Sequence, residues 1–175
     1  LFNGMPPMHH REPGVVGAAL TTGGVRAEII ADGVHVAPTM IRLAVAAKGI
    51  DGVLLITDSM AATGCADGEY SVGPQKVYVR NGEARLDSGA LAGSTLTLDR
   101  ALVNLACWTD VGLGGAWQRA SLNPARQLGL DGHLGRVAPV YDADLMAMNE
   151  GGQVVLTMVA GEIVYQACDH AHNSL

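Results

Sequence analysis

The stretch Gly52–Asp58, which reads GVLLITD, decides the fold class of this 175-residue chain. Its four branched apolar residues, Val53–Ile56, follow one another without a polar interruption. Such a run is typical of a strand buried on both faces of a parallel sheet. An aspartate follows at the point where the strand would leave the sheet. The stretch therefore predicts an α/β protein with a carboxylate at the carboxyl edge of its sheet.

A second predicted strand, followed by a predicted helix, precedes this stretch. Arg26–Ala31 (RAEIIA) has the character of a strand, and Asp32–His35 (DGVH) follows as its exit loop. Pro38 suits the first turn of a helix, which Gly49 would end. A strand, a helix and a second buried strand in this order indicate parallel β/α units.

Downstream, the pattern changes to a hairpin and then to helices. Lys76–Arg80 and Glu83–Leu86 are joined by Asn81-Gly82, a pair that accepts the positive φ angles of a type I′ turn. Ser94–Leu105 is predicted as a helix capped by Ser94 or Thr95. Ala116–Leu128 is predicted as a helix that its proline either kinks or divides into two pieces.

The last quarter of the chain is predicted to be a small β-layer. Residues 1–130 then form an α/β body, 131–167 the β-layer and 168–175 a frayed tail, with strands expected at Leu134–Ala138, Asp144–Met148, Val154–Val159 and Glu162–Tyr165. Three or four parallel strand ends are visible, whereas a closed (β/α)8 barrel needs eight strands and about 250 residues. Only part of a barrel fits in this length.

The composition excludes some classes of partner. The formal net charge is -6 and the 11 basic residues are scattered, so no surface for nucleic acid is indicated. No apolar run approaches the ~18 residues that a membrane span needs. The three cysteines form no Cys-x-x-Cys pair, which suits a reducing cytoplasm.

Two polar residues follow successive predicted strands. Asp58 lies directly after the second strand and His35 after the first, where α/β enzymes build their sites. Asp58 has an ordinary alternative role as a helix cap, and His35 as a structural histidine. Because both would reach the same rim of the sheet, the joint interpretation as a site is stronger than either alone.

Three further features are weaker candidates. Arg11 offers a planar fork of donors for a phosphate or carboxylate, although an ion pair with Glu12 would also explain it. His9 and His10 are adjacent, which is not a metal-ligand spacing in a helix or strand. Leu91–Ser94 would open a helix, whose free N–H groups could hold a polar group of a substrate.

Six motifs in order resemble those of the N-acetylglucosamine-6-phosphate deacetylases of the amidohydrolase superfamily: Leu1–Pro7, His10–Gly14, Ile30–His35, Thr57–Met60, Leu91–Thr97 and Ala120–Arg126. The segments 135–139 and 142–145 resemble the closing strands of amidohydrolases, so the resemblance extends from Leu1 to about Tyr165. It implies the C-terminal portion of a (β/α)8 TIM-type barrel with a small β-sandwich tail at 131–167. It also implies cytoplasmic aminosugar metabolism.

The resemblance also implies roles. Asp58 would be the catalytic acid and base, working with a divalent metal, zinc or iron, that activates water for attack on the acetamide of a phosphosugar. His35 would bind the sugar and orient or polarise the acetamide, and Arg11 would hold the 6-phosphate, reaching across a homodimer. The substrate-binding residues implied are Asn3, Gly4, Arg11, Asp32, Gly33, Val34, His35, Leu91, Ala92 and Gly93.

Two departures from the family pattern bear on the metal. The family motif begins with a metal-binding histidine, one position before the equivalent of Leu1, and Gly4 replaces an alanine. The metal ligands are therefore expected mainly upstream of Leu1, with only Asp58 as a possible ligand here, and an upstream half of the protein is an expected partner. Without it the chain is expected to be a poor catalyst. The alternatives are another N-acyl amidohydrolase and a non-catalytic half-barrel remnant.

Overall fold

The computed structural model describes residues 1–168 and is centred on a parallel pair of strands. Strands β1 (Ala27–Ile30) and β2 (Val53–Ile56) pair along their whole length. Helix α1 (Gly14–Thr21) precedes β1, and α2 (Pro38–Lys48) connects β1 to β2. The strand–helix–strand unit predicted from the sequence is confirmed, whereas α1 has no counterpart in the prediction.

The boundaries of this unit follow from its sequence. Pro38 is the first residue of α2, where its missing N–H costs no hydrogen bond. Gly49 ends the helix at φ 66°, a left-handed value that glycine adopts without strain. The side chains of Ile29, Ile41 and Val53 are completely buried and join the two layers.

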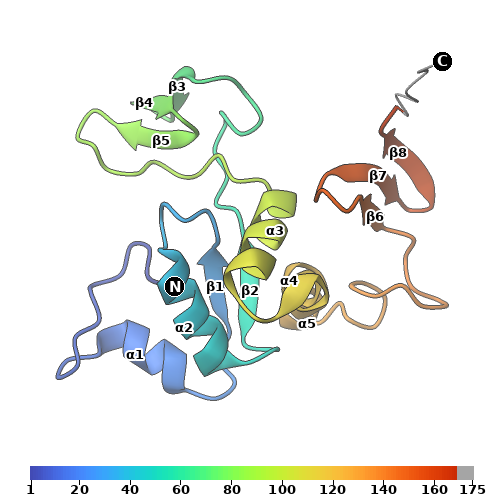
Figure 1. Cartoon of the computed structure of the whole chain (residues 1–175), viewed down its shortest axis with the longest axis horizontal. Coiled ribbons are helices and arrows are strands. Elements are labelled where there is room, and N and C mark those ends of the chain that lie inside the picture. Colours follow the sequence, from blue (N-terminus) through green and yellow to red (C-terminus); the bar gives the residue numbers. More distant parts are fainter. Residues whose placement is uncertain (169–175) are drawn as a thin grey trace.

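A three-stranded antiparallel sheet projects from the end of β2 (Figure 1). It consists of β3 (Gly68–Val72), β4 (Gln75–Arg80) and β5 (Glu83–Leu86), in that order. The hairpin expected at Asn81-Gly82 is present, and both turn residues have positive φ, 52° and 75°. Strand β3 adds a partner for β4 that the sequence analysis did not define.

The helical prediction is right in part. Helix α3 (Leu98–Trp108) starts later than expected, so the predicted caps at Ser94 and Thr95 are wrong. Ser94 instead forms a parallel β-bridge with Ser59, which keeps this stretch extended.

The helix expected at Ala116–Leu128 is divided into α4 (Gly112–Ala120) and α5 (Leu122–Leu128). The break falls at Ser121, which leaves Pro124 in the first turn of α5, where a proline is tolerated.

The C-terminal β-layer contains three strands rather than four. Strands β6 (Leu145–Met148), β7 (Val154–Val159) and β8 (Glu162–Gln166) are antiparallel in that order. The strand predicted at Leu134–Ala138 is wrong, because this segment is bent and packs against α5. A Cβ on Gly135 would lie 2.8 Å from the Leu122 Cα, so the chain passes the helix too closely for a regular strand. The predicted frayed tail lies outside the described residues, apart from residue 168.

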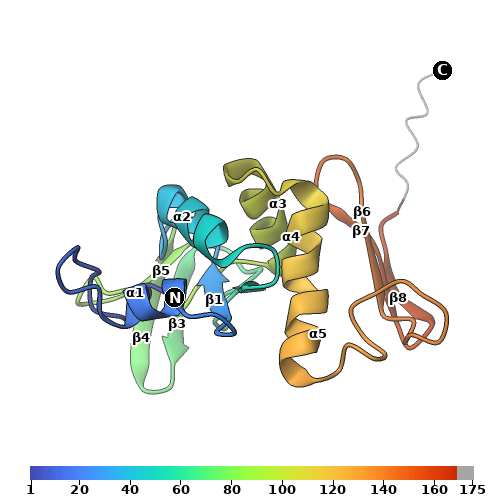
Figure 2. The ribbon, with the colours of Figure 1, turned by 90° about the horizontal axis from the view of Figure 1, so that it is seen from below.

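The core joins most of these layers. One large apolar cluster unites β1, β2 and helices α1 to α4, and a second, small one lies under the hairpin sheet. Helices α3 to α5 lie between the parallel pair and the β6–β8 sheet (Figures 1 and 2). The described part is therefore a mixed α/β fold. None of its helices has both the length and the apolar character needed to cross a bilayer.

Candidate functional site

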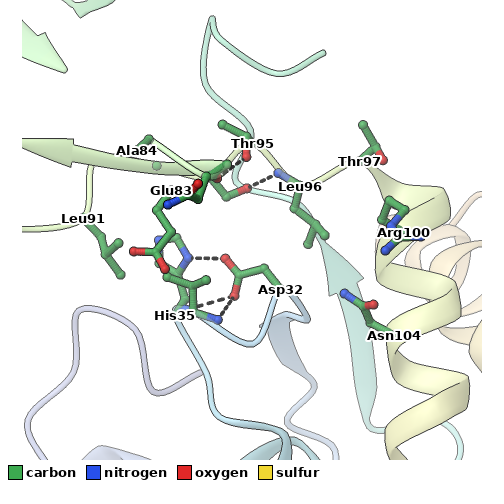
Figure 3. A pocket seen from close by; sticks show the side chains of 15 residues that line it. Asp32, His35, Glu83, Ala84, Leu91, Thr95, Leu96, Thr97, Arg100 and Asn104 are labelled. Atoms are coloured by element: carbon green, nitrogen blue, oxygen red, sulfur yellow. Dashed lines mark hydrogen bonds and ion pairs between the residues drawn. The ribbon is translucent and has the colours of Figure 1, made fainter. Parts of the chain in front are cut away.

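The loop after β1 holds a partly buried aspartate–histidine pair. Asp32 Oδ1 accepts the backbone N–H groups of Val34 and His35, each at 2.9 Å. Asp32 Oδ2 lies 2.6 Å from His35 Nδ1 (Figure 3). The His35 side chain is only 3% exposed and that of Asp32 12%, so water competes little for these contacts. The loop therefore orients the imidazole by a charge-assisted hydrogen bond.

Helix α3 also holds this loop in place. Asn104 Nδ2 donates to the Ala31 carbonyl at 2.8 Å. Gly33 has φ 79°, and a Cβ there would lie 3.1 Å from the Trp108 ring. Only glycine meets both the backbone and the space requirement at this position.

A cavity of about 270 Å³ opens beside this loop. Figure 3 shows Glu83 and Leu91 on one side of the His35–Asp32 pair and Arg100 and Asn104, both on α3, on the other. The walls come from the β1 exit loop, the hairpin tip and the segment leading into α3, and they comprise Asp32, Val34, His35, Asn81–Ala84, Leu91, Gly93–Thr97, Arg100 and Asn104.

The hairpin tip is held over this cavity by hydrogen bonds. The Asp67 carboxylate accepts the N–H groups of Asn81, at 2.5 Å, and Gly82, at 3.3 Å. The Thr95 hydroxyl donates to the Gly82 carbonyl. Glu83 pairs with Arg85 at 2.8 Å. The tip thus forms a fixed wall of the cavity.

Asp58 lines a neighbouring pocket of about 510 Å³. Its side chain is exposed, its φ is 51°, and its carbonyl accepts the Ser94 N–H at 2.8 Å. Leu91 and Gly93 line both pockets, and Ala92 lines the Asp58 pocket. Because β1 and β2 are parallel and in register, Asp58 and the Asp32–His35 loop lie beyond the same edge of the sheet.

The N-terminal candidates lie outside the linings of these two pockets. Asn3, Gly4 and Arg11 line neither pocket. They are exposed in the loop that leads to α1, and Arg11 Nη1 lies 2.8 Å from His10 Nε2.

Within residues 1–168, no three His, Cys, Asp or Glu side chains come close enough together to hold a metal ion. Asp58 therefore belongs to no group of three possible ligands in this part of the chain, and these residues alone do not make up a metal site.

Sequence reasoning missed the polar wall opposite His35. Asn81, Glu83 and Arg100 line the cavity, yet no motif or periodicity marks them as functional. The Asn81-Gly82 turn predicted the hairpin but not the direction in which its tip points. That direction depends on contacts with Asp67 and Thr95, which are 13 to 15 residues away.

The 120–126 motif lies at the opposite end of β2, where it has a structural task. Asn123 is fully buried, and its Nδ2 donates to the carbonyls of Ile50, at 2.9 Å, and Val53, at 3.0 Å. Beside it, burial lowers the pKa of Arg119, and the nearby carboxylate of Asp51 partly opposes this shift. This end of the sheet therefore anchors α4 and α5.

Comparison with known proteins relates this arrangement to enzymes. Residues 21–164 match the amidohydrolase family. The chain is 42% identical to N-acetylglucosamine-6-phosphate deacetylase of Bacillus subtilis (strain 168), over 94% of this chain and 42% of that protein. It is also 42% identical to a putative N-acetylgalactosamine-6-phosphate deacetylase of Escherichia coli (strain K12), over 93% of this chain and 96% of that protein.

A solved structure gives the same relationship. The mutant N-acetyl-D-glucosamine-6-phosphate deacetylase of Mycobacterium smegmatis, in complex with N-acetyl-D-glucosamine-6-phosphate, is 38% identical with a TM-score of 0.88, over 95% of this chain and 44% of that one. The chain thus spans less than half the length of the Bacillus and Mycobacterium proteins. Members of the family generally use a divalent metal. With the family model matched over most of its length, the chain belongs to the amidohydrolase family.

Proposed function

We propose that this chain supplies the C-terminal part of the active site of a deacetylase that hydrolyses N-acetylglucosamine 6-phosphate to glucosamine 6-phosphate and acetate. One observation carries the proposal. Asp58 and the Asp32–His35 pair lie beyond one edge of a parallel sheet, in pockets that share Leu91 and Gly93. The relatives that share this fold are named as phosphosugar deacetylases.

Asp58 is the proposed proton carrier. As a carboxylate it accepts a proton from the attacking water, and it then returns that proton to the departing amine. Its exposed position beside a pocket leaves it accessible to water and substrate. The pair formed by His35 and Asp32 offers a fixed imidazole that binds the sugar near the acetamide. Leu91, Ala92 and Gly93 connect the two pockets and are proposed to contact the substrate between them, together with Gly33 and Val34.

The rest of the site is proposed to come from the N-terminal loop and from a segment outside the described residues. The ligands of a divalent metal, zinc or iron, belong to an upstream half of the barrel, because residues 1–168 provide no cluster of three. In that setting β1 and β2 are strands of a (β/α)8 barrel, and β6–β8 form part of a β-sandwich. Asn3 and Gly4 approach the substrate in the completed site. Arg11 binds the 6-phosphate across a homodimer, in the cytoplasm.

A second substrate is favoured by one observation. The Escherichia coli relative is as similar to this chain as the Bacillus one, and its name specifies the galactose epimer. The two sugars differ only at the C4 hydroxyl. N-acetylgalactosamine 6-phosphate is therefore the alternative substrate.

Complementation tests the proposal. The chain is mixed with the upstream segment of the Bacillus subtilis relative and with zinc or ferrous iron, and acetate release is measured with each phosphosugar. We expect release only from the complemented mixture, with a higher kcat/KM for the preferred epimer. The variant Asp58→Asn should lower kcat by at least a hundredfold, since general acid–base catalysis contributes about that much or more. The matched control Asp142→Asn, at an exposed position away from both pockets, should leave it unchanged.

Other outcomes have definite meanings. A folded complex that releases acetate from neither sugar contradicts the proposal and favours a non-catalytic half-barrel. Hydrolysis of other N-acyl compounds alone favours a different amidohydrolase. Activity of Asp58→Asn within tenfold of the unchanged chain rules out the proton-carrier role.

A further inference from the structure

We infer that Asp32 is a positioning residue that keeps the proton of the neutral His35 ring on Nδ1, so that Nε2 presents a lone pair to the cavity. This inference deepens the proposed function and rests on it for its catalytic meaning. It assigns Asp32 a different task from direct contact with the substrate.

The carboxylate of Asp32 is already committed within its own loop. Oδ1 accepts two backbone N–H groups, those of Val34 and His35, and Oδ2 faces His35 Nδ1. These contacts use three of the roughly four acceptor sites of a carboxylate. With 12% of its side chain exposed, Asp32 has little surface left for a substrate. Its influence on the reaction therefore passes through the histidine.

The contact with His35 selects one tautomer. An ionised carboxylate can only accept, so the nitrogen that faces it at 2.6 Å must carry the proton. In a neutral imidazole the other nitrogen, Nε2, then has a free lone pair. The two backbone hydrogen bonds hold the carboxylate in place before any ligand binds, so the tautomer is a property of the loop itself.

The surroundings of Nε2 show that this atom remains available. The one side-chain hydrogen bond of the His35 ring within residues 1–168 is made by Nδ1, so none engages Nε2. Among the described residues, Arg119 Nε is the one side-chain atom that is both sealed from solvent and unpaired, so Nε2 is not sealed. The rest of the ring is packed, since the side chain is 3% exposed and lines the cavity. Nε2 is thus the atom that His35 offers to a ligand.

The chemical consequence is a defined polarity for this wall of the cavity. Neutral His35 accepts a hydrogen bond through Nε2, so it selects a donor on the substrate, such as a sugar hydroxyl or the acetamide N–H. A ring with the opposite tautomer would donate instead and would select a carbonyl or phosphate oxygen. Asp32 thereby decides which of these groups faces His35.

Nitrogen NMR of the 175-residue chain with ¹⁵N-labelled histidine tests this directly. The chain has six histidines, so the His35 signals are assigned by their loss in His35→Gln. At a pH where the ring is neutral, we expect a protonated Nδ1 and an unprotonated Nε2 for His35. In Asp32→Asn the amide can still accept the backbone N–H groups, but its NH₂ faces Nδ1, and the proton should move to Nε2.

The control and the contradicting results are clear. Asp142→Asn, which changes an exposed aspartate outside the loop, should leave the His35 tautomer unchanged. A proton on Nε2 in the unsubstituted chain overturns the inference, as does a proton that stays on Nδ1 in Asp32→Asn. If Asp32→Asn does not fold, the unsubstituted chain alone decides. The NMR measurement needs neither metal nor turnover, so it is independent of the proposed function. If the complemented enzyme is inactive but His35 carries its proton on Nδ1, the proposed function is refuted and the inferred tautomer is supported.

Discussion

At the scale of single residues, the site depends on a glycine as much as on its charged groups. Gly33 separates Asp32 from the two amides that its carboxylate accepts, and it combines φ 79° with close approach to Trp108. A side chain here would strain the backbone and push against the indole. The loop that orients His35 therefore tolerates no Cβ at its second position.

The variant Gly33→Ala tests this. We expect it to lower the free energy of unfolding by about 2 kcal/mol, because a left-handed conformation costs an L-residue roughly 1–2 kcal/mol and the contact with Trp108 adds to it. The measurement is urea denaturation. Gly23→Ala is the matched control: its Cβ would meet open space and its φ lies outside the left-handed region, so the change should stay within about 0.5 kcal/mol. Equal effects of both substitutions would contradict the account.

The sequence was informative about which residues follow the strands. Asp58 and His35 could be predicted because a strand end in a parallel sheet has a known edge. Arg100 and Glu83 could not, since their place at the cavity depends on tertiary packing of α3 and the hairpin. The motif also did not reveal that Asp32 binds His35. A carboxylate in a Gly-containing loop can face either its own backbone or a ligand, and the sequence does not distinguish the two.

At the scale of elements, the β3–β5 sheet is attached to the site through the tip of its β4–β5 hairpin. Asp67, which precedes β3, binds both turn amides, while Thr95 binds the Gly82 carbonyl. The turn chemistry of Asn81-Gly82 was readable from the sequence because it is local. Strand β3, with its mostly exposed residues, has no apolar alternation to reveal it.

Removing the Asp67 carboxylate should loosen the tip. In Asp67→Ala we expect faster amide hydrogen exchange at Asn81 and Gly82, since both lose their acceptor, while the amides of β1 and β2 keep their protection. Mass-resolved or NMR-detected exchange measures this. Glu69→Ala, on the exposed face of the neighbouring strand, is the control and should leave the tip unchanged. Uniform acceleration throughout the chain would mean that Asp67 supports the whole fold instead.

The errors in the element prediction share a cause. Leu134–Ala138 has strand-like residues, but it is bent and passes close to α5. Ser94 has the composition of a helix cap, yet its N–H and hydroxyl are used by β2's exit loop. In both places a contact distant in sequence overrides a local preference.

At the scale of the whole molecule, stability is divided between two apolar clusters. The large one includes Val53, and the small one, under the hairpin sheet, includes Val77; both side chains are completely buried. The small cluster contains four buried residues, all of them Val or Ala. Such a unit can open without unfolding the rest.

This division predicts different costs for the same substitution. Val53→Ala should lower the global free energy of unfolding by about 2–3 kcal/mol, as expected for methyl deletions in a packed core. Val77→Ala should lower it by only about 1 kcal/mol and instead speed amide exchange within residues 68–86. Denaturation and exchange on the two variants make a matched pair. If both cost the same globally, the hairpin sheet folds as one unit with the body.

The opposite ends of β2 suggest how such a protein can change over time. The proposed catalytic groups lie beyond Ile56, whereas Arg119 and Asn123 anchor the helices near Gly49 and Val53, at the other end of the same four-residue strand. Loops at the first end can diversify while the second end remains fixed. Selection for a new substrate and selection for heat resistance would thus draw on separate sets of positions, and an engineer could pursue both in one library.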